Sequence, residues 1–191
     1  ITEEKAWANP LHRLAHHAPL TGLPNRLVFE GRLVGALASA RRNYSRVALV
    51  FIDLNGFKTI NDSLGHAAGD QVLKTTATRL YEALRNSDSV ARLGGDEFVT
   101  VLEGLSTERT PEDEARVIAE RLLVSLDTPI SVGNTRRRVG VSLGIALFPE
   151  HGQTRDQLIH VADLAMYEAK RSGDNQYRLG QAQVTSSRTG K

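Results

Sequence analysis

The sequence contains no cysteine, no long apolar run and little net charge. The absence of cysteine excludes both a disulfide framework and a thiolate metal site, and it fits a reducing compartment. No apolar stretch approaches the roughly 20 residues of a membrane span, and no signal-peptide pattern opens the chain. A formal net charge of +2 is too weak to indicate nucleic-acid binding, so we expect no nucleic acid among the partners.

A length of 191 residues with 40% hydrophobic content suits one folded domain with some linker. The chain starts at Ile1 rather than methionine, and we expect it to be a piece of a longer protein. Residues 1–17 carry apolar side chains at helical spacing on either side of Pro10, which predicts a short or kinked linker helix. The polar residues 181–191 predict a disordered tail.

Between these ends, helical and strand patterns interleave. Asn25 is suited to cap the first helix, and Pro111 stands in the first turn of a later one. The patterns predict helices over about 27–42, 57–63, 69–85, from 111 onward and 154–171, and strands over about 47–52, 89–93, 97–102, 129–132, 138–148 and 176–179. This alternation indicates an α/β or α+β domain in which helices cover a sheet.

Two adjacent glycines, Gly94 and Gly95, lie between the apolar runs at 89–93 and 97–102, which predicts a tight β-hairpin because glycine adopts positive φ without steric cost. Asp96 follows at once. Asp53 ends the buried strand predicted upstream. Carboxylates on neighbouring strand ends form a site for a hard cation, and Mg²⁺ in proteins is held by one or two such groups plus substrate phosphates.

Three motifs now stand in order along the chain: residues 20–26 (LTGLPNR), residues 51–58 (FIDLNGFK) and residues 94–98 (GGDEF). Together they resemble the GGDEF family of diguanylate cyclases, and the likeness extends over about residues 16–180. The resemblance implies a domain over residues 18–180 with a central, mainly antiparallel sheet flanked by helices, similar to nucleotidyl cyclases and the palm of polymerases. It also implies condensation of two GTP molecules into cyclic di-GMP with release of two pyrophosphates.

By this resemblance, Asp53, Asp96 and the backbone carbonyl of Leu54 bind two Mg²⁺ ions per active site, for which Mn²⁺ can substitute. Asp96 can also accept the proton of the attacking 3′-hydroxyl. Glu97 either contacts the metal directly or adjusts the site by interacting with the metal ligands. Lys58 is assigned the stabilisation of phosphate charge during transfer, and its alternative is a solvated lysine.

The substrate-binding residues implied by the resemblance are Asn61 and Asp70 for guanine, His66 for a further contact and Lys170 for the triphosphate. A carboxylate can accept both donors of the guanine edge, while an amide can pair with the remaining acceptors. An alternative role for Asp70 is to cap a helix that begins there, and both roles can hold at once.

Two positions depart from the family pattern. Ala18 stands where the family usually has an aspartate that ties the incoming linker to the domain. Asp174 stands where a second basic residue often binds phosphate, so triphosphate affinity is expected to be weaker unless Arg171 substitutes.

Arg85 and Asp88 have the spacing and position of the family's inhibitory RxxD site, and Arg116 matches a further arginine that the partner subunit often supplies. Guanidinium groups bind phosphates and stack on guanine, so the resemblance implies allosteric inhibition by cyclic di-GMP. The alternative is an arginine at a helix end that pairs with an acid and stabilises weakly.

The resemblance further implies a homodimer, because one subunit offers only half of the site. It implies an upstream, PAS-like sensor domain and, in some members, a downstream phosphodiesterase domain. We expect this domain to be cytoplasmic. Other segments of the full-length protein could attach that protein to a membrane. The rival hypothesis is a catalytically weak module that binds GTP or cyclic di-GMP and regulates an attached domain.

Overall fold

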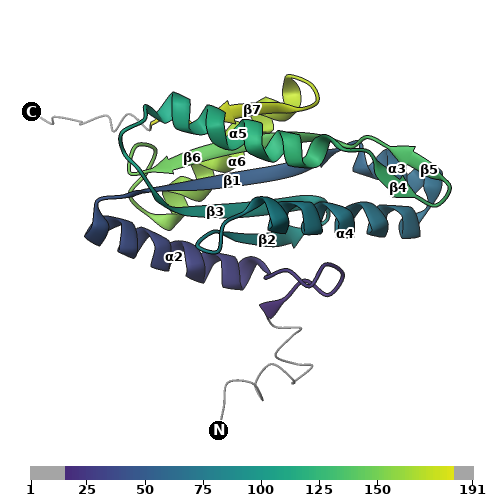
Figure 1. Cartoon of the computed structure of the whole chain (residues 1–191), viewed down its shortest axis with the longest axis horizontal. Helices are drawn as coiled ribbons and strands as arrows, with labels where there is room; N and C mark the ends of the chain where they lie inside the picture. Colours follow the sequence, from purple (N-terminus) through teal and green to yellow (C-terminus); the bar gives the residue numbers. More distant parts are fainter. Residues whose placement is uncertain (1–15, 183–191) are drawn as a thin grey trace, which may run out of the picture.

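The computed structural model describes residues 16–182, and its centre is a five-stranded sheet of order β2-β3-β1-β6-β7 (Figure 1). Every pairing in this sheet is antiparallel except that of β6 with β7. The strands are β1 (Arg46–Asn55), β2 (Ser89–Gly94), β3 (Glu97–Leu105), β6 (Gly140–Phe148) and β7 (Gln176–Leu179), with β4 (Ile130–Val132) and β5 (Thr135–Arg137) forming a separate two-stranded sheet. The expected mainly antiparallel α+β architecture is confirmed.

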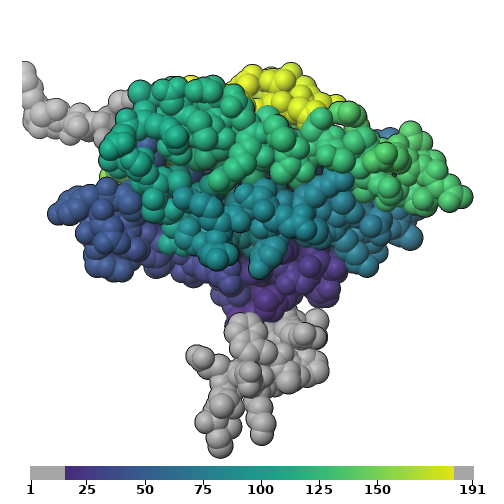
Figure 2. All heavy atoms as spheres, in the orientation of Figure 1, coloured from purple at the N-terminus to yellow at the C-terminus, as the bar shows by residue number. Residues whose placement is uncertain are grey.

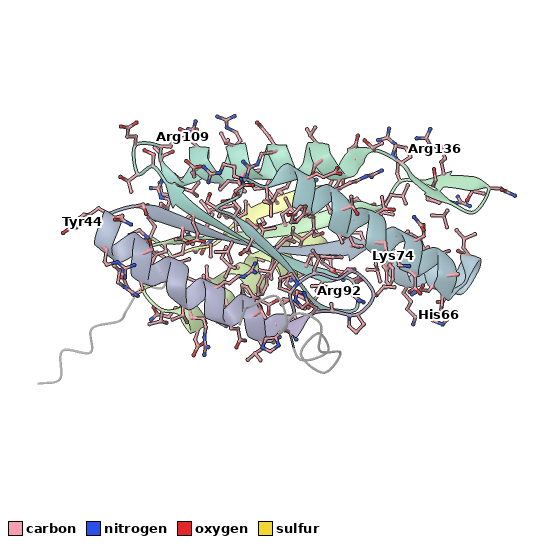
Figure 3. All side chains as sticks on the ribbon, turned by 60° about the horizontal axis from the view of Figure 1, so that its bottom comes forward. Tyr44, His66, Lys74, Arg92, Arg109 and Arg136 are labelled. Carbon is pink, nitrogen blue, oxygen red and sulfur yellow. The ribbon has the colours of Figure 1, made fainter. Side chains whose placement is uncertain are left out.

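Helices cover both faces of the sheet. They are α2 (Arg26–Asn43), α3 (Phe57–Leu64), α4 (His66–Ala83), α5 (Pro111–Asp127) and α6 (Arg155–Arg171). The side of the molecule shown in Figure 2 is formed by α5 above, α4 across the middle and α2 below. Tyr44, just after α2, and His66, which begins α4, lie at opposite ends of the molecule (Figure 3).

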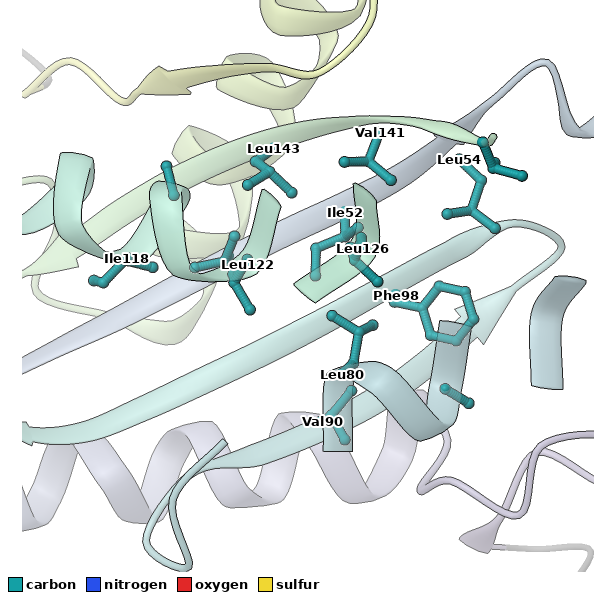
Figure 4. Packing of buried hydrophobic residues seen from close by; sticks show 14 of the residues in the cluster. Ile52, Leu54, Leu80, Val90, Phe98, Ile118, Leu122, Leu126, Val141 and Leu143 are labelled. Atoms are coloured by element: carbon teal, nitrogen blue, oxygen red, sulfur yellow. The ribbon is translucent and has the colours of Figure 1, made fainter. Parts of the chain in front are cut away.

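The central strand β1 is buried on both faces because its alternate side chains enter two separate cores. Ala48, Val50 and Ile52 pack with residues of α4 and α5. Figure 4 shows this core, in which Phe98 of β3 shares a cluster with Leu80 of α4. Leu49 and its odd-numbered neighbours pack on the other face, with residues of α2 and α6. Side chains at odd positions of β1, and at odd positions from 97 to 101 of β3, therefore point toward α2 and α6.

The helix ends follow the capping residues of the sequence. Asn25 accepts a hydrogen bond from the backbone N–H of Val28 at 3.2 Å, and Thr110 and Thr154 cap α5 and α6 in the same way. Pro111 occupies the first turn of α5, as predicted.

Two boundaries correct the sequence prediction. The helix expected from residue 69 begins at His66, because Gly65 with φ of 91° separates it directly from α3. Asp70 therefore lies inside α4, and its predicted role as a helix cap is wrong. The strand expected from Arg138 begins at Gly140.

Most of the predicted linker helix and tail, residues 1–15 and 183–191, lies outside the described residues. Over residues 16–182, no helix combines the length and apolarity that crossing a bilayer requires.

Candidate active site

The hairpin between β2 and β3 brings Asp96 to the end of the central strand. Gly94 and Gly95 have φ of 143° and 49°, which glycine adopts readily. Directly opposite, Asp53 of β1 pairs with Glu97 of β3. The backbone N–H of Leu54 donates to the carbonyl oxygen of Asp96 at 3.2 Å, so the hairpin turn is joined to β1.

Strand alternation places Asp53 and Glu97 on the sheet face covered by α2 and α6. Gly144 of β6 lets helix α6 pack directly on the sheet there, because a Cβ at this position would lie only about 2 Å from the backbone of α6. As a result Lys170 of α6 reaches Asp53, with 2.6 Å between Nζ and Oδ2. The Asp53 side chain is buried, at 4% exposed, whereas that of Lys170 is 53% exposed.

The carboxyl groups of this cluster repel one another. Burial and then the charge of Asp53 raise the pKa of Asp96, and a hydrogen bond between the two side chains acts in the same direction. Burial and the same Asp53 charge raise the pKa of Glu97. The hydrogen bond that Lys170 donates to Asp53 raises the pKa of the lysine. The cluster thus gathers more negative charge than one lysine balances, and a bound cation would relieve this repulsion.

The donor set suits Mg²⁺ completed by substrate. Within residues 16–182, no group of three or more His, Cys, Asp or Glu side chains is arranged as a metal cage. Asp53 and Asp96 form a pair, and pairs of carboxylates that share Mg²⁺ with phosphates are common. The carbonyl of Leu54 faces the hairpin, because the N–H and C=O of one strand residue point to the same neighbouring strand.

Lys58 and three of the predicted substrate residues, Asn61, His66 and Asp70, lie on α3 and α4, immediately beyond β1. Lys58, His66 and Asp70 are exposed, and Asn61 is half-buried. Gly69 permits the close packing of the two helices, since a Cβ there would lie only 1.8 Å from Oδ1 of Asn61. The side chain of Asn61 is therefore held against α4.

The RxxD pair forms a closed ion pair. Asp88 accepts hydrogen bonds from Nε and Nη2 of Arg85, each at 3.2 Å, and from the backbone N–H groups of Arg85 and Glu103. The Asp88 side chain is 0% exposed, so its carboxylate is not open to solvent and serves to orient Arg85. Arg85 also donates to the carbonyl oxygen of Glu103 at 3.0 Å, and its side chain remains 49% exposed.

A pocket of about 320 Å³ opens beside Arg85, and it is lined also by Arg32 of α2 and Tyr81 of α4. Arg116 does not line it. That residue lies on α5, where it contacts Asp113 and Glu120.

Residues 15–176 match the family described as diguanylate cyclase, GGDEF domain. The chain belongs to the GGDEF family.

Curated relatives of this GGDEF domain include the diguanylate cyclase TpbB of Pseudomonas aeruginosa, which is 46% identical over 87% of the chain. The bifunctional diguanylate cyclase/cyclic di-GMP phosphodiesterase MucR of the same organism is 44% identical over 87% of the chain. The chain spans only 38% of the length of TpbB and 24% of that of MucR. A solved GGDEF domain of TpbB superposes with a TM-score of 0.81 at 47% identity, covering 87% of this chain and 95% of that one.

Ala18 and Asp174, the two departures from the GGDEF pattern, both lie within the described part of the chain. Ala18 forms a turn through its backbone alone, with its N–H bonded to the carbonyl of Leu23 at 2.7 Å and its carbonyl to the N–H of Gly22. Asp174 lies against Gly140 at the start of β6, where a Cβ on the glycine would be 2.9 Å from the Asp174 side chain. Arg171 lies over the ring of Tyr167.

Sequence reasoning gave no role to Arg32 or Tyr81, because their contribution to the pocket depends on how α2 and α4 pack. Asn61 was selected as a site residue, but nothing local indicated that Gly69 holds it in place. In principle a glycine inside a predicted helix is a signal, since it costs about 1 kcal/mol relative to alanine and often marks a close approach.

Proposed function

We propose that this GGDEF domain condenses two GTP molecules into cyclic di-GMP with release of two pyrophosphates. The observation that carries the proposal is the adjacency of the Asp53 and Asp96 carboxylates, with Lys170, at the hairpin end of the sheet. The high identity to TpbB, which is named a diguanylate cyclase, supports the same reaction.

In this proposal Asp53, Asp96 and the Leu54 carbonyl hold two Mg²⁺ ions, or Mn²⁺ in their place. Such ions, when bound, would supply Lewis acidity at the α-phosphate and would lower the pKa of the 3′-hydroxyl. Lys170 is exposed enough to turn from Asp53 toward the triphosphate. Lys58 stabilises charge on the transferred phosphate, and Glu97 adjusts the electrostatics of the cluster.

Guanine selection is assigned to Asn61 and Asp70, with His66 as a further contact. These groups lie on neighbouring helices, and Asn61 is fixed against Gly69. ATP would leave these polar groups without their partners on the guanine edge, which is the basis for discrimination against it.

Two chains are required, because one protomer presents one set of acids and one guanine site. Each 3′-hydroxyl would attack the α-phosphate held by the partner subunit, so we propose a homodimer that forms in the full-length protein. We further propose that residues 1–17 connect the domain to an upstream sensor, and that residues 181–191 form a tail that can lead to a phosphodiesterase domain, as the name of MucR suggests. The domain would work in the cytoplasm, where GTP is available.

The direct test is turnover by a forced dimer, made by fusing the chain to a parallel two-stranded coiled coil. With GTP and Mg²⁺ it should form cyclic di-GMP, and replacement of GTP by ATP should give no cyclic dinucleotide. Absence of product from GTP at high enzyme concentration would refute the cyclase proposal.

A second candidate function is a binding module that regulates an attached domain. Asp174 favours it, because a carboxylate cannot bind the triphosphate where the family often has a basic residue. This module would bind GTP or cyclic di-GMP in a titration and still give no product as a forced dimer.

Gly69→Ala should weaken GTP binding without touching any atom of the nucleotide. The added Cβ would collide with Oδ1 of Asn61, so the amide must leave its place. Losing about one hydrogen bond predicts roughly a three- to tenfold increase in Kd. The measurement is calorimetric titration with 3′-deoxyGTP, which lacks the nucleophile.

The control is Gly31→Ala on α2. A Cβ at Gly31 meets nothing within 4 Å, so this variant should gain up to about 1 kcal/mol of stability and bind the nucleotide normally. If Gly69→Ala folds and retains the original Kd, Asn61 does not read guanine.

A further inference from the structure

Arg92 makes a bidentate contact with the turn that carries the metal-binding acid. Its Nε and Nη2 atoms both donate to the carbonyl oxygen of Gly95, at 3.0 and 2.8 Å. Figure 3 labels Arg92 on β2 beside the hairpin. The Gly95 carbonyl belongs to the peptide group between Gly95 and Asp96. The guanidinium therefore holds the orientation of this peptide group, and with it the direction of the Asp96 side chain.

Arg92 is itself anchored. Its backbone N–H donates to the carbonyl oxygen of Pro24 at 3.0 Å, so the turn that leads into α2 holds the strand at this residue. On the other side of the hairpin, Leu54 holds the carbonyl of Asp96. Asp96 thus stands between two fixed peptide groups, one bonded by Arg92 and the other by β1.

This anchoring matters because the turn is otherwise weakly constrained. Gly94 and Gly95 have no side chains to pack, and the strand register shifts between Arg92 and Gly94. Asp96 stands beside the buried Asp53, because the next residue of β1, Leu54, donates to the Asp96 carbonyl, and two neighbouring carboxylates repel each other. Without an external restraint, the turn could relieve this repulsion by moving Asp96 away from Asp53.

The side chain of Arg92 starts from the sheet face opposite to the acids. Arg92 pairs with Phe98, which packs in the core under α4, whereas Asp53 lies toward α6. Arg92 therefore reaches the turn from behind and leaves the metal side open.

We propose that Arg92 is a positioning residue, which holds the Gly95–Asp96 peptide so that the Asp96 carboxylate stays beside Asp53 for metal binding. The proposal rests on the proposed metal-dependent function. Residues that orient metal ligands in this way typically contribute about 10- to 100-fold to metal affinity or activity.

The test compares Arg92→Ala and Arg92→Lys with the control Arg79→Ala. Arg79 is half-buried like Arg92 and also donates to two loop carbonyls, those of Thr128 and Pro129, but on α4 away from the hairpin. Binding of Mn²⁺ in the presence of 3′-deoxyGTP is followed by the electron paramagnetic resonance of free Mn²⁺, which requires no turnover. Nucleotide binding without metal is measured in parallel.

Arg92→Ala should weaken Mn²⁺ binding about 10- to 100-fold and leave metal-free nucleotide affinity unchanged. Arg92→Lys should recover part of the loss, since an ammonium can donate to Gly95 but without the fork of the guanidinium. Arg79→Ala should bind Mn²⁺ normally. Unchanged Mn²⁺ binding in Arg92→Ala would overturn the proposal, as would a loss of metal-free nucleotide binding, which would make Arg92 a substrate contact.

Failure of the proposed function is separable from failure of this inference. If the forced dimer makes no cyclic di-GMP but Arg92→Ala still loses Mn²⁺ affinity, the positioning role stands and the cyclase assignment falls. If the dimer is active and Mn²⁺ binding by Arg92→Ala is normal, the reverse holds.

Discussion

Replacing Asp96 with asparagine should reduce the formation of cyclic di-GMP by at least about a thousandfold. The change removes one of two carboxylates that meet at the hairpin and keeps the side-chain shape. Metal-ion Lewis acidity supplies several kcal/mol to phosphoryl transfer, and about 4 kcal/mol corresponds to a thousandfold in rate. The measurement is turnover of GTP by the forced dimer at saturating Mg²⁺.

The same variant should be no less stable than the original chain in the absence of metal. Because burial and Asp53 raise the pKa of Asp96 in the folded state, ionisation of Asp96 works against folding. The protonated Asp96 contributes stability that is fully present below the pKa of Asp96 in the unfolded chain. This stability is lost as the pH rises through the higher pKa of Asp96 in the folded state. At neutral pH Asp96→Asn removes that loss, so thermal unfolding without metal should occur at the same or a higher temperature.

The matched control for this variant is Asp127→Asn. Asp127 is an exposed acid paired with Arg138 at the C-terminal end of α5, and surface pairs of this kind contribute little. It should retain full turnover. If Asp96→Asn kept turnover within threefold of the original, the metal-site assignment would be wrong.

Arg85→Ala should relieve product inhibition and leave kcat unchanged. Arg85 is half exposed, is held in place by a fully buried Asp88 and borders a pocket of about 320 Å³. Hydrogen bonds to a charged group contribute about 1.5–3 kcal/mol, which predicts an increase of roughly 10- to 100-fold in the inhibition constant for cyclic di-GMP. Inhibition is measured by adding cyclic di-GMP to the forced dimer at fixed GTP.

The fold should survive this substitution, because Asp88 keeps its hydrogen bonds from the backbone N–H groups of residues 85 and 103. Arg138→Ala, which breaks another surface pair of arginine and aspartate, serves as the control and should remain fully inhibited. A variant at Arg85 that is inhibited as strongly as the original would show that the arginine only stabilises a helix end. Arg116→Ala separates a contribution from the partner subunit, since Arg116 does not line this pocket.

Much of the fold could be predicted because its signals are local. The hairpin depends on two adjacent glycines, and the helix starts depend on Asn25, Thr154 and Pro111. The start of α4 was missed because Gly65, which serves as both the end of α3 and the start of α4, interrupts one apolar pattern without a capping side chain.

The sequence by itself determined the family, the kinds of elements and the acids at the two strand ends, because glycine pairs, capping residues and strand periodicity act over a few neighbouring residues. Only the tertiary structure decided that Lys170 lies on Asp53, that Gly69 confines Asn61 and that Arg92 holds the hairpin turn. These contacts depend on how helices and turns pack on the sheet. Close packing brings these residues together through complementary shape and charge although most of them are far apart in the sequence, so no local sequence pattern predicts the contacts.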